Sequence, residues 1–204
     1  MRNGSFRPGV LAERATVRKM QRMTATKWNF DLAHSSVNFH VRHMMIAKVH
    51  GRFTKWEGSL ELDEADLTKS KIDVTIDIAS VDTRDEKRDG HLRSADFFDA
   101  EQFPAMTYKS TSIKKLSDET YEVTGDLTLR GTTKQVALEV EFNGKGKDPW
   151  GGTRVGFSAK ATINRKEFGL NWNAALEAGG VLVGEKVAIN LEIQAVQAAD
   201  AAAA

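Results

Sequence analysis

Charged side chains are concentrated between Arg84 and Arg93, where they could bind a ligand of opposite charge. A guanidinium group matches the geometry of phosphate oxygens, so Arg88, His91 and Arg93 are candidates for holding an anionic group. The alternative is structural: Asp89 anchors the arginines, and the segment is a salt-bridged loop. Both interpretations stay open from the residues alone.

Four histidines lie close together in the sequence: His34, His40, His43 and His50. Histidine is a common metal ligand, and two strands could bring these side chains together. However, His40 and His43 differ in parity along a strand and should point to opposite faces. No H-E-x-x-H spacing occurs either. We therefore expect no metal site and assign these histidines to structural hydrogen bonds.

Asp31, His34 and Ser35 supply the residue types of a hydrolase triad. Within one turn they cannot easily align as nucleophile, base and orienting group, and no G-x-S-x-G motif is present. The sequence contains no cysteine, which excludes disulfides, thiolate catalysis and cysteine-based zinc sites. We expect a protein that is not an enzyme and needs no cofactor.

Most of the chain alternates apolar and polar residues with the period of a β-strand. The alternation predicts strands at 28–31, 36–43, 49–62, 71–81, 108–115, 120–129, 134–143, 153–163 and 181–196. Within 49–62 the apolar phase slips by one residue, which predicts a β-bulge near 54–58. About eight amphipathic strands without βαβ alternation favour a closed antiparallel barrel with an interior wide enough for one small ligand.

The segment 88–111 interrupts this pattern. Ser94 is placed to cap a short helix, Phe97, Phe98 and Phe103 bring aromatic rings together, and Pro104 ends the helical turn. We predict a helical plug at one mouth of the barrel.

Length and composition indicate one domain with tails. We expect a flexible basic segment at 1–26, the barrel at 27–196 and an alanine-rich tail at 197–204. The first residues lack the apolar run of a signal peptide, and no stretch approaches a membrane span, so we expect a cytoplasmic protein that does not span a membrane. The net charge of +1 gives no reason to expect nucleic acid as a partner.

Several motifs in register resemble the YceI-like family of lipid (polyisoprenoid)-binding proteins. They stand at 28–43 (WNFDLAHSSVNFHVRH), 49–53 (VHGRF), 88–100 (RDGHLRSADFFDA), 103–111 (FPAMTYKST), 123–134 (VTGDLTLRGTTK) and 163–172 (INRKEFGLNW). The resemblance implies an all-β fold, an extended antiparallel eight-stranded lipocalin-like β-barrel with short helices near its mouth. It also implies non-covalent binding of a long apolar lipid, either a polyisoprenoid, an isoprenoid quinone or a fatty acyl derivative. Relatives suggest a homodimer as a possible assembly.

With this resemblance, the inward-facing apolar residues become candidates for an apolar tunnel: Phe39, Phe53, Ile72, Val74, Ile76, Ile78, Met106, Tyr108, Val140, Phe142 and Phe157. Phe168 and Trp172 are candidates for a hydrophobic lid over a mouth, or for a satellite core beneath a loop. Arg88, His91 and Arg93 become candidates for binding a lipid headgroup. Two alternatives remain: an enzyme acting on an apolar substrate in the same barrel, and a stress or interaction protein whose barrel is filled by its own side chains.

Overall fold

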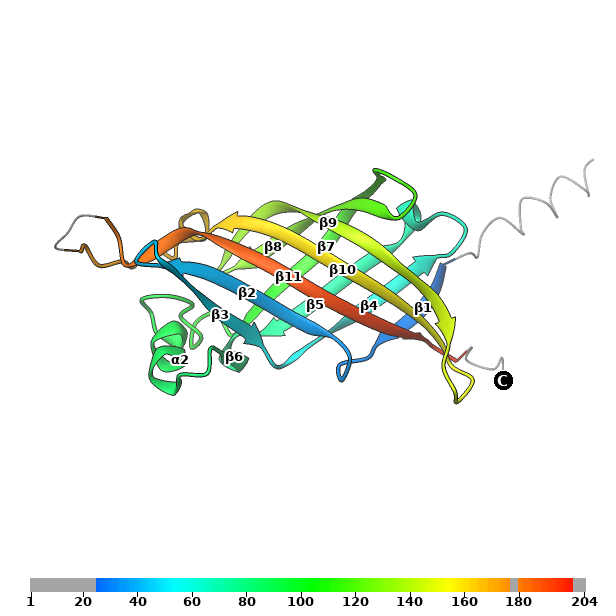
Figure 1. Cartoon of the computed structure of the whole chain (residues 1–204), viewed down its shortest axis with the longest axis horizontal. Helices are drawn as coiled ribbons and strands as arrows, with labels where there is room; N and C mark the ends of the chain where they lie inside the picture. Colours follow the sequence, from blue (N-terminus) through cyan, green and yellow to red (C-terminus); the bar gives the residue numbers. More distant parts are fainter. Residues whose placement is uncertain (1–24, 177–179, 200–204) are drawn as a thin grey trace, which may run out of the picture.

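A single antiparallel sheet makes up most of the computed structural model, which describes residues 25–176 and 180–199 (Figure 1). The expected basic segment, apart from its last two residues, and most of the alanine-rich tail lie outside the described residues. The strands are β1 (Ala25–Phe30), β2 (Ser36–His43), β3 (Ala47–Phe53), β4 (Trp56–Asp63), β5 (Lys71–Asp77), β6 (Val81–Asp82), β7 (Ala105–Lys115), β8 (Thr120–Leu129), β9 (Thr132–Lys147), β10 (Thr153–Asn164) and β11 (Val183–Gln197). The helical elements are α2 (Glu86–Arg93) and the 3-10 turns η1 (Leu67–Lys69), η2 (Ile78–Ser80) and η3 (Arg165–Phe168).

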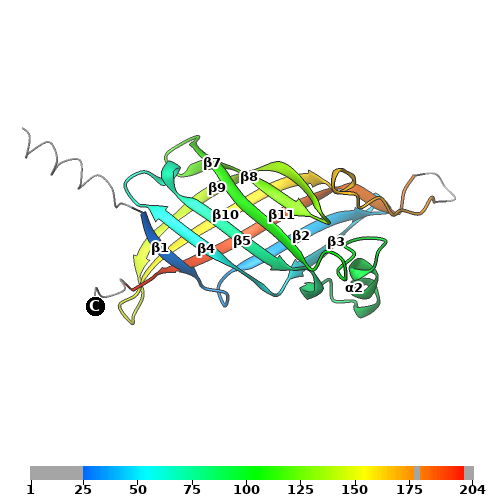
Figure 2. The same ribbon diagram turned by 180° about the vertical axis from the view of Figure 1, so that it is seen from behind.

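The sheet closes into a barrel of eight strands, as the sequence predicts. The order β1-β4-β5-β7-β8-β9-β10-β11 returns to β1 through the β1–β11 pairing. One half of β11 pairs with β2 and its last residues pair with β1, so β2 continues the path of β1 after a turn. In the same way β4 continues the path of β3, because β3 pairs with β2 and β4 pairs with β1. Figure 2 shows the barrel from behind.

The expected β-bulge at 54–58 is wrong: the chain breaks into two strands there. β3 ends at Phe53 and β4 begins at Trp56, and β4 takes new partners in β1 and β5. The two residues between the strands reset the alternation, so Phe53 and Trp56 are both buried although they lie three positions apart. A break therefore explains the phase slip that we attributed to a bulge.

The helix near the barrel mouth begins earlier than the sequence analysis expects. α2 begins after Asp85, whose side chain accepts a hydrogen bond from the Arg88 backbone N–H at 3.1 Å. Ser94 ends this helix, because its backbone is extended and its hydroxyl donates to the His91 carbonyl at 2.8 Å. Ser94 is thus a C-cap and not the predicted N-cap. α2 and the loop after it lie beside β6 at one end of the barrel (Figures 1 and 2).

Two apolar clusters line and pack the interior of the barrel. The larger one lines the interior and includes the aromatic side chains of the loop after α2. The smaller one consists of Trp28, Leu60, Leu62, Val155 and Ala195, where β1, β4, β10 and β11 meet. Trp28 is 2% exposed and Ala195 is fully buried. This cluster packs the end of the barrel that lies far from α2.

Candidate functional site

A cavity of about 260 Å³ runs inside the barrel. Every strand except β6 contributes to its wall, and α2 contributes Leu92. Carbon atoms form practically all of its surface. Its volume is close to the lower end of typical small-molecule pockets, roughly 300–1,000 Å³. Such a cavity offers an apolar ligand dispersion contacts and shelter from water, and its surface carries no charged group that could bind a polar ligand.

Three polar side chains of the cavity wall form hydrogen bonds with other protein groups. The Tyr108 hydroxyl donates to the backbone carbonyl of Val123 at 2.9 Å, and burial raises the pKa of Tyr108, so the phenol stays neutral. Ser70 accepts a hydrogen bond from the Asp63 backbone N–H at 3.1 Å. Asn38 donates to the Ser36 hydroxyl at 2.8 Å. Each of these groups therefore stabilises the wall instead of facing a ligand.

Arg165 is the charged residue of the wall, and sequence reasoning missed it. Its side chain is 3% exposed. The guanidinium donates to the carbonyls of Gly184 at 2.9 Å, Leu170 at 2.5 Å and Val183 at 3.3 Å. Burial lowers the pKa of Arg165, and the charge of Glu185 opposes that shift. Arg165 thus joins η3 to the start of β11 and presents its aliphatic stem to the cavity.

Nine of the eleven tunnel candidates line the cavity: Phe39, Phe53, Ile72, Val74, Ile76, Met106, Tyr108, Val140 and Phe157. The other two, Ile78 and Phe142, and the two lid candidates, Phe168 and Trp172, pack around the cavity without being part of its lining. Ile78 lies in the 3-10 turn η2, where strand alternation no longer applies. Sequence reasoning missed lining residues from β8, from β11 and from the loop after α2, although the alternation of β8 and β11 carried that signal.

Aromatic side chains join α2 to the loop after η3. The Trp172 ring lies 4.8 Å from the His91 ring and 5.2 Å from the Phe97 ring, measured between centroids. Phe168, at the end of η3, is 1% exposed. These contacts place Phe168 and Trp172 in the packing that covers the α2 end of the barrel.

The three headgroup candidates lie outside the cavity lining and attach α2 to its neighbours. Arg88 donates to the hydroxyl and the carbonyl of Thr83, both at 2.7 Å. Arg93 donates to the carbonyls of Ala79 and Val81. His91 contacts the Asp96 carboxylate at 2.8 Å. The buried Asp89 accepts from the Thr83 backbone N–H at 2.9 Å. It therefore holds the loop through Thr83 and pairs with no arginine of the described residues.

The histidines do not assemble into a metal site within residues 25–176 and 180–199. The rings of His40 and His50 lie 5.2 Å apart across the β2–β3 pair. His34 contacts Asp31 at 2.9 Å, but the Ser35 hydroxyl donates to the Gln194 carbonyl at 3.2 Å. These three residues therefore form a turn and not a catalytic triad. None of the described helices is long and apolar enough to cross a bilayer.

The cavity lining reaches the end of the barrel where β2 meets β3. Val41, Val183 and Val187 line the cavity there and are partly exposed. Towards the other end, the cavity residues Leu60 and Leu62 are each only 4% exposed, whereas Phe30 and Phe157 are partly exposed. The cavity therefore extends along the barrel between the hairpin and the Trp28 cluster.

These features define the class: a closed, eight-stranded, lipocalin-like β-barrel around an apolar cavity. The chain belongs to the YceI-like domain family, whose model matches residues 28–195. A UPF0312 protein of Staphylococcus epidermidis is 44% identical over 163 residues, which cover 79% of this chain and 92% of that protein.

Solved structures share the barrel. The YceI protein of Campylobacter jejuni is 32% identical, with a TM-score of 0.68 over 78% of this chain and 90% of that chain. BcnA of Burkholderia cenocepacia is 26% identical, with a TM-score of 0.71 over 81% and 99%. A polyisoprenoid binding domain from Saccharophagus degradans has a TM-score of 0.59 over 84% and 98%, and at 17% identity this likeness shows the fold alone.

Proposed function

We propose that this barrel binds the apolar chain of a lipid non-covalently in its interior and thereby sequesters or carries that lipid. The carbon-lined cavity supports the proposal most directly, because it offers an apolar chain a dry environment and offers a polar molecule nothing. Membership of the YceI-like family agrees with it. A polyisoprenoid, an isoprenoid quinone or a fatty acyl derivative meets the requirement.

The energetics require a carrier of this kind. Each methylene group removed from water contributes about 0.8 kcal/mol, so a long chain leaves a membrane only for a comparably dry site. The cavity surface is practically all carbon, so the polar head of the ligand would remain outside the cavity. The cavity also favours binding over the alternative of a barrel filled by its own side chains. An enzyme acting on an apolar substrate has less support, because the cavity surface presents no nucleophile or base among the described residues.

Native mass spectrometry of the purified protein, followed by organic extraction, tests the proposal. We expect one long-chain lipid per barrel, recovered chemically unchanged. A clean unliganded mass that stays the same after addition of quinones, polyprenols and fatty amides would contradict it. An enzyme would return an altered molecule.

A cavity-filling variant locates the binding. Ala159 lines the cavity between Val140 and Leu191 in the cross-strand register, so Ala159→Trp places a large ring in the space. Losing contact with two or more methylenes lowers affinity for a fluorescent acyl probe by about tenfold or more. The neighbouring Lys160 is exposed on the outer face, so Lys160→Trp is the matched control and should bind the probe as the wild type does. Equal affinity of both variants would place the ligand elsewhere.

A further inference from the structure

Exposed apolar side chains gather at the tip of the β2–β3 hairpin. Met44, Met45 and Ile46 form the turn and are 41%, 56% and 81% exposed. Val181, 37% exposed, lies on the adjacent segment, which meets the turn through a hydrogen bond from the Met44 backbone N–H to the Leu182 carbonyl at 2.8 Å. Four of the seven large exposed hydrophobic residues in the described chain are therefore at this one place.

The backbone of this turn is unfavourable for the residues that occupy it. Met44 and Met45 have φ values of 50° and 62°, in the left-handed region. Tight hairpin turns with positive φ favour asparagine and glycine, because side chains with bulk strain this conformation. The hairpin thus holds two methionines and an isoleucine in solvent at a conformational cost, which points to a use for them.

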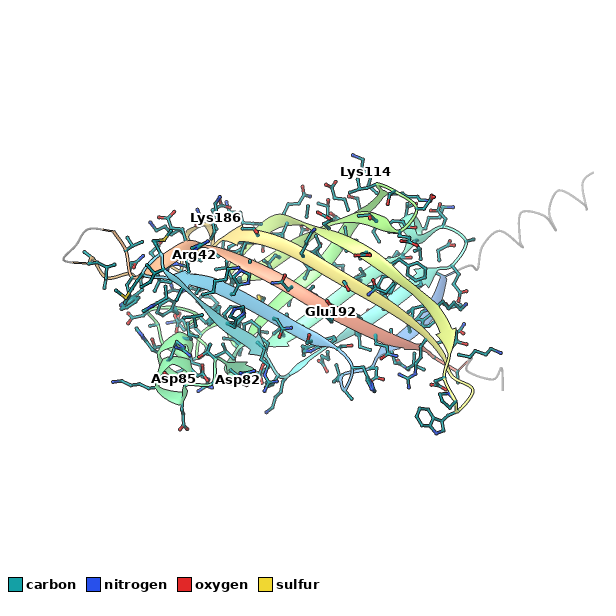
Figure 3. All side chains as sticks on the ribbon, viewed as in Figure 1. Arg42, Asp82, Asp85, Lys114, Lys186 and Glu192 are labelled. Carbon is teal, nitrogen blue, oxygen red and sulfur yellow. The ribbon has the colours of Figure 1, made fainter. Side chains whose placement is uncertain are left out.

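The outer face of the same hairpin is cationic. The sequence from 32 to 56 contains no aspartate or glutamate. Arg42, which Figure 3 labels, lies directly opposite Lys48 in the strand register. Neither side chain forms an ion pair with a carboxylate of the described residues. Like charges opposite each other destabilise a strand pair. By contrast, Arg52 further along β3 pairs with Asp82 at 2.8 Å.

We propose that the β2–β3 hairpin docks the protein on a bilayer of anionic phospholipids. Ile46, Met45 and Met44 enter the interface, while Arg42 and Lys48 contact lipid headgroups. An amphipathic surface of this kind binds through buried apolar area together with attraction to anionic lipids. The hairpin adjoins Val41 and Val183, which line the cavity, so docking brings this end of the cavity to the membrane. The docking surface extends the proposed function, and vesicle binding is measurable without any ligand in the barrel.

Co-sedimentation of the full chain with vesicles tests this docking. One set of vesicles is phosphatidylcholine alone, and in the other about one lipid in three is phosphatidylglycerol. We expect binding to the anionic vesicles that weakens as salt rises. Each basic residue near the surface contributes about fivefold in affinity, so Arg42→Gln with Lys48→Gln lowers binding roughly 30-fold. Ile46→Gln lowers it roughly tenfold or more.

The far end of the barrel offers matched controls. Trp150, in the β9–β10 loop, is 86% exposed, so Trp150→Ala removes a larger apolar group from the opposite end. Lys114 and Lys147 are exposed lysines at that end (Figure 3 labels Lys114), so Lys114→Gln with Lys147→Gln removes the same charge as the hairpin double variant. We expect both control proteins to bind vesicles within about twofold of the wild type.

Three results would overturn the docking proposal. They are equal binding to neutral and anionic vesicles, full binding by Ile46→Gln, and losses as large in the control variants as in the hairpin variants. Binding to poly(U) RNA that matches vesicle binding and ignores Ile46→Gln would assign the cationic face to a polyanion instead. Probe affinity of the barrel, measured on the same variants in the absence of vesicles, separates failure of docking from failure of lipid binding.

Discussion

Arg165→Met isolates the buried guanidinium that joins η3 to β11. The substitution keeps an unbranched apolar stem against the cavity and removes donors to three carbonyls, those of Gly184, Leu170 and Val183. The Val183 carbonyl keeps the Asn173 side-chain amide as a donor at 2.7 Å, so two buried acceptors lose theirs, at about 1–3 kcal/mol each. Removing a buried cation that lacks a carboxylate partner within the described residues recovers part of that loss. We expect a net loss of about 2–4 kcal/mol in the free energy of unfolding.

Urea denaturation measures this loss directly, and thermal unfolding should show Tm lower by roughly 4–16 °C. Lys166→Met is the matched control, because the next residue forms only an exposed ion pair with Glu185, and such pairs contribute under about 1 kcal/mol. A loss below about 1 kcal/mol in Arg165→Met, or equal losses in both variants, would refute the role assigned to the guanidinium.

Three further outcomes are expected. A Cβ on Gly51 would lie 2.3 Å from the Phe39 ring, so Gly51→Ala should cost about 1–3 kcal/mol in urea denaturation, whereas Gly146→Ala, with nothing within 4 Å, should cost little. Burial, and then the charges of Lys48, His50 and Arg42, lower the pKa of His40, so the unfolded chain binds this proton more tightly. The contribution of neutral His40 to the free energy of unfolding is complete above the ordinary pKa of 6.5 and is lost as pH falls through the lower pKa of the folded state. Between about pH 7.5 and about pH 5, His40→Gln should therefore lose less free energy of unfolding than the wild type, and an equal loss would contradict this. A saturating lipid, at about a hundred times Kd, should add about 2.7 kcal/mol and raise Tm by roughly 5–10 °C in a thermal shift assay, and no shift would argue against binding to the folded barrel.

Alternation predicts much of the fold because one face of each strand must be buried. Ile72, Val74 and Ile76 follow this rule along β5, and all three line the cavity. The rule fails where the chain leaves the strand: Ile78, in phase with them, lies in a 3-10 turn. The alternation cannot distinguish a β-bulge from a break between two strands, since either one shifts the apolar positions by one residue. Only the partners of β3 and β4, which are distant in sequence, decide between them.

Capping residues and buried charges were harder to predict. Asp85 and Ser94 both carry oxygens that cap helices, and the choice between them depends on α2 lying beside β6, where Thr83 binds Asp89 and Arg88. Arg165 looked like one basic residue among others in 163–172. Its burial depends on carbonyls from β11, nearly twenty residues later. The sequence therefore did not predict polar contacts that depend on residues distant in the chain, whereas it did predict the burial of apolar residues that follows from local periodicity.

Local costs gather at the β2–β3 hairpin. The turn at Met44 and Met45 is conformationally unfavourable, Arg42 and Lys48 repel each other across β2 and β3, and Ile46 is 81% exposed. At the opposite end Trp150 is exposed as well, but Trp28 is buried and Arg154 pairs with both Asp148 and Asp31. A sequence selected for stability alone would relieve such costs at both ends, and departures of this kind are expected at functional sites. The costs at the hairpin therefore support the docking proposed for it, because the apolar turn and the two cations without an ion pair lie together there.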